Sequence, residues 1–371
     1  IGYVSSDFRE HPVSYLLSQV FALHDQNKFD LHAYSLGPSQ TSPLRDHIIQ
    51  SCTHFLDCGM MSDGQIAQHI ADDKIDVLID LNGFTAGSRT GIFVQRPAPL
   101  QVNYLGYPGT MGAEFIDYII GDSIIFSAAN MQSLTEKRIT LPHSYLPHSP
   151  RHISARHMSR AEFELPEQAT VFCCLNSQYK INPQVFTSWS RILKAVPDSV
   201  LWLSADNEKA KENLKQAAQQ NGVDPARLIF AARMQDYADH LARYRLADLF
   251  LDTLPYNAHA TANDALWAGL PVLTQMGEAF AGRVSASLLH ALGMPELIAQ
   301  SQDEYEQMAI SYGSDPSALR HLKDKLAHQS AAAPLFETAT YTRNLERAFE
   351  MIVQRHRDQL PCDHIMLSYE A

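Results

Sequence analysis

Short apolar runs alternate with amphipathic stretches along the whole chain, and this alternation constrains the fold more than any other feature. Strand-like runs occur at residues 2–4, 30–36, 76–81, 100–106 and 117–122, and again at 170–175, 199–204, 227–232, 248–252 and 271–276. Apolar positions at helical spacing fall between them, as at 12–24, 62–71, 206–220 and 282–291. Because parallel neighbours need crossover helices, the pattern predicts an α/β chain with two parallel-sheet, Rossmann-like domains.

A change in composition marks the domain boundary. Residues 141–160 are rich in Pro, Ser and His and lack apolar periodicity, which is typical of a linker. We therefore expect an N-terminal lobe at 1–158, a C-terminal lobe at 159–335 and a helical segment at 336–371 that packs across both lobes. Two such lobes facing each other would form a central cleft at the carboxyl ends of their strands, where α/β proteins bind ligands.

The charge and cysteine content exclude several classes of protein. The chain has 41 acidic and 29 basic residues, which argues against nucleic-acid binding because phosphate neutralisation needs clustered Lys and Arg. No apolar run approaches the roughly 20 residues of a membrane span, and no signal peptide opens the chain. The chain begins without Met inside a strand-like run, so we expect it to be a fragment. Five cysteines without zinc-site spacing suit a reducing, cytoplasmic environment.

The segment "YNAHATANDALWAGLPVLTQMGE" (256–278) carries the strongest site signal. Small residues after the strand at 248–252 predict a helix that begins near residue 260, with its first N–H groups available to a phosphate. Thr261 could add a hydroxyl and His259 a ring donor, and Asp264 one turn further on could reach ribose hydroxyls. Capping of the helix by Asn257 or Thr261 explains the same residues without a ligand.

Two further residues sit in loops that follow strands. Lys180 follows the strand at 170–175, where its charge could neutralise a diphosphate leaving group; a plain surface lysine is the alternative. His11 precedes Pro12 at the start of the first helix, where it could act as a general base or as a donor to a sugar, or could be structural.

Two glycine-bearing turns, at 81–90 and 105–113, permit close backbone approach to a ligand. The second has G-x-x-G-x-x-G spacing with Pro108 inside it, which does not match a dinucleotide-binding fingerprint and argues against a Rossmann dehydrogenase. The chain contains no Asp-x-Asp pair, which an enzyme that binds a nucleotide diphosphate through a divalent metal would typically show. We therefore expect metal-free chemistry that uses Lys180 and a helix dipole, and we expect no cofactor. Cys173 and Cys174 lie within an apolar strand and are expected to be inert core residues.

Taken together, these segments resemble the protein O-linked N-acetylglucosamine transferases and their SPINDLY-type relatives. The resemblance covers nearly the whole chain and is carried by "GYVSSDFREHPVSYL", "DVLIDLNGFTAGSR", "RPAPLQVNYLGYPGTMGAEFIDYII", "YKINP", "LADLFLDTLPYNAHATANDALWAGLPVLT" and "GRVSASLL". It implies a GT-B fold and an inverting, metal-independent transfer of N-acetylglucosamine from UDP-N-acetylglucosamine to Ser or Thr hydroxyls of proteins. It also implies upstream tetratricopeptide repeats, which this sequence lacks.

The resemblance also implies roles for particular residues. His11 matches a base or substrate-orienting group, and Lys180 matches the lysine that contacts the diphosphate. The other residues that the resemblance assigns to UDP are Ser177, the phosphate-binding helix start at His259, Ala260 and Thr261, the ribose carboxylate at Asp264, and the uracil-flanking His240 and Arg243. It assigns a sugar or acceptor pocket to Asp76, Thr85, Leu105, Gly106, Tyr107 and Pro108. Three positions depart from the family pattern: Asp76 stands where animal enzymes have a second His of the cleft, Ser177 replaces a nucleotide-binding Gln, and Tyr256 replaces a smaller residue.

Three alternatives remain open at this stage. The same fold could use another nucleotide hexose such as glucose or fucose, it could act as a UDP-sugar epimerase or hydrolase without a protein acceptor, or it could be a non-catalytic UDP-binding scaffold.

Overall fold

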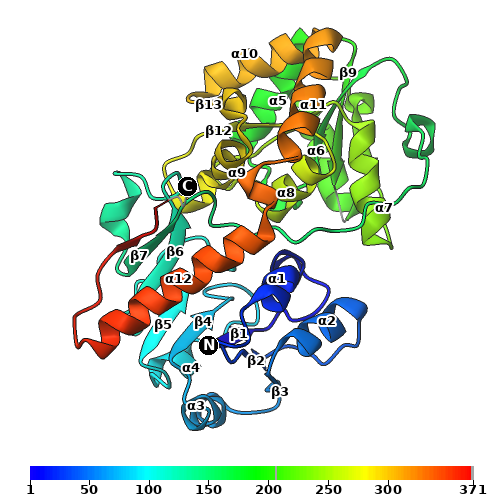
Figure 1. Ribbon diagram of the computed structural model, residues 1–371. Helices are drawn as coiled ribbons and strands as arrows, with labels where there is room; N and C mark the ends of the chain where they lie inside the picture. The colour runs from blue at the N-terminus through cyan, green and yellow to red at the C-terminus, as the bar shows by residue number, and fades with distance from the viewer. Residues whose placement is uncertain (205–206, 369–371) are drawn as a thin grey trace. The chain divides into compact units, whose positions relative to one another are not determined.

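The chain forms two compact units in the computed structural model, which describes residues 1–204 and 207–368 (Figure 1). The first unit comprises residues 1–150 together with the segment from Pro334 onward, and the second comprises Arg151–Ala333. The boundary therefore lies within the linker predicted at 141–160. The C-terminal segment that the sequence suggested as separate belongs to the first unit, because its helix packs against the first helix of the chain and an edge strand of the first sheet.

The first unit is built on an eight-stranded, entirely parallel sheet with the order β14-β7-β6-β5-β4-β1-β2-β3. Its strands are β1 (Gly2–Ser5), β2 (His32–Ser35), β3 (His54–Asp57), β4 (Val77–Asp80), β5 (Leu100–Asn103), β6 (Tyr118–Asp122), β7 (Lys137–Leu141) and β14 (Ile365–Met366). Its helices are α1 (Pro12–Leu23), α2 (Pro43–Ser51), α3 (Asp63–Asp72), α4 (Gly91–Val94) and α12 (Thr338–Arg357).

Helices cover both faces of this sheet, as the alternation of side chains along the strands requires. Val4 and Leu78 belong to the apolar cluster that also contains Ile66 of α3 and Phe93 of α4. Tyr3, the neighbour of Val4 along β1, points the other way and packs edge-on against Phe21 of α1 with ring centroids 4.9 Å apart. Helix α12 lies beside α1, as Figure 1 shows in orange-red and dark blue.

The second unit repeats the plan with a six-stranded parallel sheet in the order β10-β9-β8-β11-β12-β13. Its strands are β8 (Thr170–Cys174), β9 (Ser199–Ser204), β10 (Leu228–Ala231), β11 (Leu249–Leu251), β12 (Val272–Gln275) and β13 (Ile298–Ala299). Its helices are α5 (Pro183–Ala195), α6 (Glu208–Gln220), α7 (Tyr237–Ala242), α8 (Ala260–Trp267), α9 (Val284–Leu292), α10 (Gln302–Gly313) and α11 (Pro316–Ser330). Residue 206, at which the sequence placed the start of α6, lies outside the described residues.

Short 3₁₀ helices complete both units. They are η1 (Asn130–Ser133), η2 (Arg160–Phe163), η3 (Gln178–Lys180), η4 (Pro225–Arg227), η5 (Arg243–Leu246), η6 (Phe280–Gly282), η7 (Pro295–Leu297) and η8 (Pro334–Phe336). Among all described helices, none combines the length and apolar character that a membrane crossing requires.

Each sheet has one point at which the strand order reverses direction, and these points position the candidate site residues. In the first unit the reversal lies between β1 and β4, and in the second it lies between β8 and β11. Loops that leave the carboxyl ends of two such strands diverge to opposite sides, and ligands of open α/β sheets bind in the space between them. The predicted fold class, two Rossmann-like parallel-sheet domains, is confirmed.

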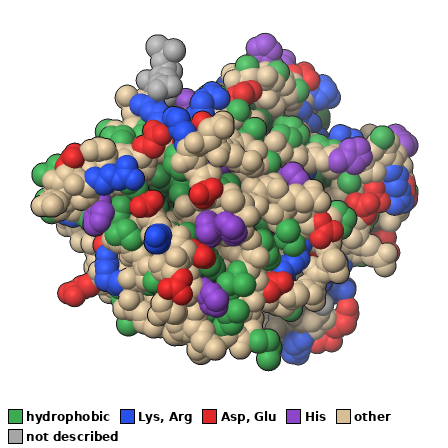
Figure 2. All heavy atoms as spheres, turned by 60° about the horizontal axis from the view of Figure 1, so that its bottom comes forward, with side chains coloured by type: hydrophobic (Ala, Val, Ile, Leu, Met, Phe, Trp, Pro, Cys, Tyr) green, Lys and Arg blue, Asp and Glu red, His purple; other side chains and the backbone are tan. Residues whose placement is uncertain are grey.

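Acidic and basic side chains are intermingled on the surface that Figure 2 shows. Blue, red and purple groups alternate there among tan and green ones. Within the described part of this face, no continuous basic area is visible.

Candidate functional site

Lys180 bridges the two loops at the place where the strand order of the second sheet reverses, between β8 and β11, which is called its switch point. It lies on η3, directly after β8, and its Nζ donates a hydrogen bond to the carbonyl oxygen of Asn257 at 2.7 Å. Two other bonds join the same loops: Asn176 Nδ2 to Thr253 Oγ1 at 3.1 Å, and Asn182 Nδ2 to the carbonyl oxygen of Leu254 at 2.6 Å. Three hydrogen bonds therefore join the loop after β8 to the loop after β11, and one of them is donated by the Lys180 ammonium.

The turn that leads from β11 to α8 is shaped by a buried carboxylate, Asp252. Its Oδ1 accepts from the backbone N–H groups of Thr253 (2.7 Å) and Ala258 (2.6 Å), and its Oδ2 accepts from Thr274 Oγ1 (2.7 Å). These bonds fold residues 253–258 back over the end of the strand. The fold of the turn brings Asn257 within reach of Lys180 and places His259 at the start of α8.

Burial weakens the hold of Lys180 on its proton. Removal of the ammonium from water lowers the pKa of Lys180 to about 8, although the charge of Asp252 opposes this shift. The aromatic ring of Tyr256 lies 3.9 Å from Nζ, measured to the ring centroid. Lys180 forms no ion pair with a carboxylate among the described residues, so its positive charge is available to an anionic ligand.

Helix α8 begins at Ala260 without a side-chain cap. His259 occupies the N-cap position and makes no capping hydrogen bond, so the first backbone N–H groups of the helix have no side-chain acceptor there. Ala260 and Thr261 form the first two helical positions and are half-buried. The arrangement suits an anion better than the capping alternative, in which Asn257 or Thr261 would satisfy these groups.

His259 does not supply the ring donor that the sequence suggested. Its Nε2 donates to the carbonyl oxygen of Ala281 at 3.1 Å. Burial, and secondarily the charge of Lys180, lowers the pKa of His259 to about 3, so the ring is neutral near pH 7. Since the one ring proton is on Nε2, Nδ1 carries a lone pair and cannot donate to a phosphate.

Asp264 is held by a buried network rather than left open. Its Oδ1 accepts from Arg151 Nη1 at 2.5 Å, and its Oδ2 accepts from the hydroxyl of Tyr237 at 2.7 Å. Arg151 also donates to Asn263 Oδ1 at 2.5 Å through Nη2, and its carbonyl oxygen accepts from Trp267 Nε1 at 3.0 Å. Both carboxylate oxygens of Asp264 are therefore engaged within the protein, and its side chain is only 6% exposed.

The two residues predicted to flank uracil play different parts. Arg243 is 4 % exposed; its Nη1 donates to the carbonyl oxygen of Ala232 and its Nη2 donates to His240 Nδ1, both at 2.6 Å. Burial lowers the pKa of His240 to about 3, with a further contribution from the Arg243 charge, so His240 is neutral and carries its proton on Nε2. His240 also stacks on Tyr237. Arg243 thus orients His240 and is itself too buried to touch a base.

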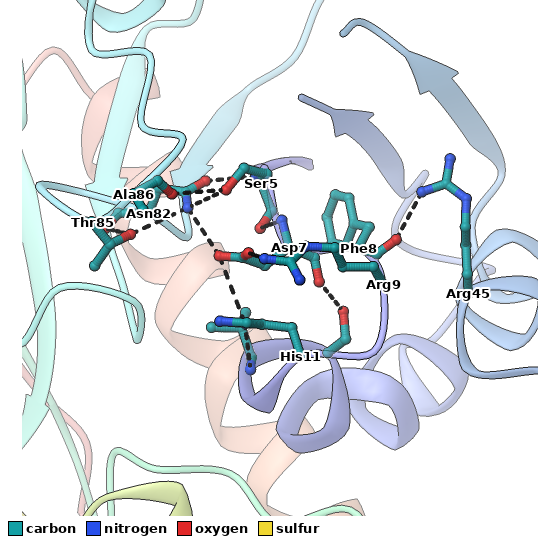
Figure 3. A network of polar contacts seen from close by, with 12 residues as sticks. Ser5, Asp7, Phe8, Arg9, His11, Arg45, Asn82, Thr85 and Ala86 are labelled. Atoms are coloured by element: carbon teal, nitrogen blue, oxygen red, sulfur yellow. Dashed lines mark hydrogen bonds and ion pairs between the residues drawn. The ribbon is translucent and has the colours of Figure 1, made fainter. Parts of the chain in front are cut away.

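The switch point of the first unit is organised by Asn82, which sequence reasoning missed. This buried side chain follows β4 and reaches the loop after β1: its Oδ1 accepts from the N–H of Ser6 at 2.7 Å, and its Nδ2 donates to Ser6 Oγ at 2.8 Å and to Asp7 Oδ2 at 3.1 Å. Thr85 joins through Oγ1, 3.3 Å from Asn82 Nδ2. Figure 3 shows this polar group with Asp7 between Asn82 and His11.

His11 lies at the first residue before α1 and caps that helix. Its Nδ1 accepts from the N–H of Val13 at 3.4 Å and lies 3.6 Å from Asp7 Oδ2. Burial lowers the pKa of His11 below its ordinary value, and Asp7 only partly offsets this effect. The bond from Val13 to Nδ1 favours the neutral tautomer with its proton on Nε2, and in that form His11 is a hydrogen-bond donor.

All predicted pocket residues of this unit except Asp76 lie at the edge of the sheet where the strands end. Thr85, Leu105, Gly106, Tyr107 and Pro108 all lie in loops after β4 or β5, at the edge of the sheet that carries Asn82. Leu105 is buried with φ +68, a left-handed conformation, and a Cβ on Gly106 would stand 1.9 Å from the carbonyl oxygen of Leu81. The close approach at Gly106 is therefore made to the protein's own backbone.

Asp76 does not belong with these residues. It directly precedes β4 and lies at the amino ends of the strands, near Ile1 and Asp30. Parallel strands place their carboxyl ends at the opposite edge of the sheet. The assignment of Asp76 to the sugar pocket was wrong for this reason. Ser177, by contrast, lies exposed on the loop after β8 beside η3, where the prediction placed it.

A cavity of about 730 Å³ lies next to the joined loops of the second unit. Its lining includes Asp252, Leu254 and Pro255 from the turn after β11, and Gly277 from the loop after β12. The described residues that line it include no Lys or Arg. This cavity therefore offers no positive charge to a diphosphate. Lys180 and the start of α8 do provide one.

Comparisons with known proteins identify the family to which the chain is similar. The profile of glycosyl transferase family 41 matches residues 1–159 and 147–345. A curated relative from Arabidopsis thaliana, named a probable UDP-N-acetylglucosamine–peptide N-acetylglucosaminyltransferase SEC, is 37% identical over 94% of this chain. The chain spans 36 to 42% of the length of this relative and two others, from Caenorhabditis elegans and Petunia hybrida.

Solved structures extend the likeness to the fold. A mutant of the O-GlcNAc transferase of Thermobaculum terrenum superimposes with a TM-score of 0.88 at 31% identity, over 96% of this chain and 68% of that one. HepE of Anabaena, solved with UDP and glucose, superimposes with a TM-score of 0.62 at 12% identity, over 94% of this chain and 99% of that one; it shows likeness of fold alone. The GT-B type expected from the sequence is confirmed.

Proposed function

Because the chain belongs to glycosyl transferase family 41, we propose that it transfers N-acetylglucosamine from UDP-N-acetylglucosamine to Ser or Thr hydroxyls of proteins. One observation carries the proposal: Lys180, which has no carboxylate partner among the described residues, spans the switch point of the second sheet beside the uncapped start of α8. A cation and a helix N-terminus at one strand edge suit a nucleotide diphosphate.

The second unit supplies stabilisation of the leaving group. As the acceptor oxygen bonds to the anomeric carbon, the bond from that carbon to the β-phosphate oxygen breaks and negative charge gathers on the diphosphate. Lys180 and the first N–H groups of α8 are the groups that would stabilise this charge, which is why we infer a reaction without a metal. Attack opposite the departing UDP inverts the anomeric centre.

His11 is proposed to orient a reactant rather than to remove its proton. Its Nδ1 accepts the capping hydrogen bond of Val13, and the remaining ring nitrogen carries the proton. A general base needs a free lone pair, which this tautomer lacks on its available side. The hydroxyl proton would then leave late, for example to a phosphate oxygen of the departing UDP.

We place the protein in a reducing, cytoplasmic compartment. All five cysteines are free, and Cys58, Cys173 and Cys174 are buried. Burial raises the pKa of Cys174 to about 12, which makes its thiol unreactive. Free thiols of this kind suit a reducing environment.

Release of UDP by the purified chain tests the proposal. UDP-N-acetylglucosamine and UDP-glucose are offered in turn, with and without a Ser/Thr-rich peptide, to the wild type, to Lys180→Met and to the exposed control Lys209→Met. We expect peptide-dependent release that Lys180→Met lowers by about 10²- to 10³-fold and that Lys209→Met retains. Release without peptide would indicate an epimerase or hydrolase, preference for UDP-glucose would indicate another hexose, and UDP binding without release would indicate a scaffold.

A further inference from the structure

Tyr256 lies between the two elements that are proposed to hold the diphosphate. The Nζ of Lys180 is 3.9 Å from the centroid of its ring. The rings of Tyr256 and His259 also meet in a T-shaped contact, with centroids 4.7 Å apart and an interplanar angle of 73°. One aromatic side chain thus contacts both the lysine of the loop after β8 and the N-cap residue of α8.

The Lys180 ammonium has few other contacts that could fix its position besides the ring of Tyr256. Among charged groups, Asp252 raises the pKa of Lys180 most, but both carboxylate oxygens of Asp252 accept hydrogen bonds from Thr253, Ala258 and Thr274. Nζ donates its hydrogen bond to a carbonyl oxygen, that of Asn257. Cys174 is buried in β8 as an inert thiol, and His259 is neutral. The face of Tyr256 is therefore the second contact that fixes the ammonium.

A cation–π contact suits this task better than an ion pair would. The negative face of the ring attracts the ammonium, yet it adds no formal charge that would cancel that of Lys180. A carboxylate in the same place would hold the lysine more strongly but would also repel an incoming diphosphate. An aromatic ring holds the side chain and leaves its net charge for the ligand.

We propose that Tyr256 is a positioning residue, whose ring face holds the Lys180 ammonium toward the diphosphate of a bound nucleotide. This inference rests on the proposed function of the second unit. The ring face, and not the phenolic hydroxyl, performs the role, so phenylalanine should replace tyrosine. Because Tyr256 acts through Lys180, its effect on the ligand should disappear when the lysine is absent.

The affinity for UDP, measured by titration calorimetry near pH 7, tests this inference without requiring turnover. The variants are Tyr256→Leu, Tyr256→Phe, Lys180→Met and the double substitution Tyr256→Leu/Lys180→Met. Tyr312→Leu, a half-buried tyrosine on α10, is the matched control, and thermal unfolding checks that each variant is folded.

We expect Tyr256→Leu to weaken UDP binding by about 5- to 30-fold, the range of a partly desolvated cation–π contact, and Tyr256→Phe to stay within about twofold of the wild type. In the Lys180→Met background, Tyr256→Leu should cause no further loss.

Two results would overturn the inference while leaving the proposed function in place. One is wild-type UDP affinity in Tyr256→Leu. The other is an equal loss from Tyr256→Leu with and without Lys180, which would mean that the ring acts on the ligand or the fold directly. Failure of the wild type to bind UDP would instead overturn the proposed function, and this inference with it.

Discussion

Arg151 and Asp264 form a nearly inaccessible ion pair, with Nη1 and Oδ1 2.5 Å apart and side chains only 7% and 6% exposed. Arg151 is the first residue of the second unit, and Asp264 lies on the helix whose start is proposed to hold a diphosphate. The pair therefore fixes the beginning of the unit to the nucleotide half of the proposed site.

Removal of one partner of this pair should destabilise the second unit strongly. Arg151→Met leaves a buried carboxylate without its cation, and we expect the free energy of unfolding to fall by about 3–5 kcal/mol. Urea unfolding followed by tryptophan fluorescence measures this unit, because Trp189, Trp202 and Trp267 all belong to it. The exposed pair of Arg156 and Glu162 provides the control: Arg156→Met should cost less than about 1 kcal/mol, and comparable losses would contradict the argument.

Affinity for UDP should depend on the charge of Lys180. Its pKa of about 8 lies below the ordinary lysine value, so the unliganded side chain loses its charge as the pH rises through about 8. We expect UDP binding to weaken over that range and to remain strong below it. In Lys180→Arg the side chain stays charged, so the decline near pH 8 should vanish. If UDP binding weakened near pH 8 in Lys180→Arg as it does in the wild type, the titrating group would be the uracil ring or another group and not Lys180.

Turnover should depend on Lys180 far more than on His11. Lys180→Met removes charge stabilisation that grows as the diphosphate departs, and we expect kcat to fall by about 10²- to 10³-fold. His11→Ala removes an orienting donor and should cost about tenfold. Steady-state kinetics with a peptide acceptor compares the two, and losses of equal size would count against the orienting role.

Gly106 should tolerate no side chain, although its backbone conformation is ordinary. A Cβ there would stand 1.9 Å from the carbonyl oxygen of Leu81, so Gly106→Ala should lower the free energy of unfolding by about 3 kcal/mol. Gly112 has φ +60 but open space around a Cβ, and Gly112→Ala should cost only about 1 kcal/mol. Scanning calorimetry ranks the two variants, and the reverse order would show that backbone strain outweighs the contact.

The sequence predicted those parts of the site that follow directly from strand ends. Lys180 and the start of α8 lie in loops after strands of the second sheet, and Thr85 lies in a loop after a strand of the first. Each parallel sheet brings the loops that follow its strands to one edge of that sheet. The prediction for Asp76 was wrong because Asp76 directly precedes β4 and so lies at the opposite edge of the sheet, where the strands begin. Arg151 could not be found, since it lies in a segment without periodicity and its partner is 113 positions away.

The individual hydrogen bonds of the site also could not be predicted from the sequence. Which ring nitrogen of His11 or His259 carries the proton depends on Val13 and on the carbonyl oxygen of Ala281, and neither contact follows from a motif. Asn82 had a partial signal, a polar residue directly after an apolar strand, but its role became clear only from its bonds to Ser6 and Asp7.

The discontinuous first unit also sets an order of events during synthesis. Strand β14 pairs with β7, and α12, whose buried residues include Leu345 and Phe349, packs against α1. A ribosome makes these residues only after the whole of the second unit has been translated. The unit that begins first is thus completed last, and until then the edge of β7 and the apolar side of α1 are open to chaperones or to wrong partners on the nascent chain.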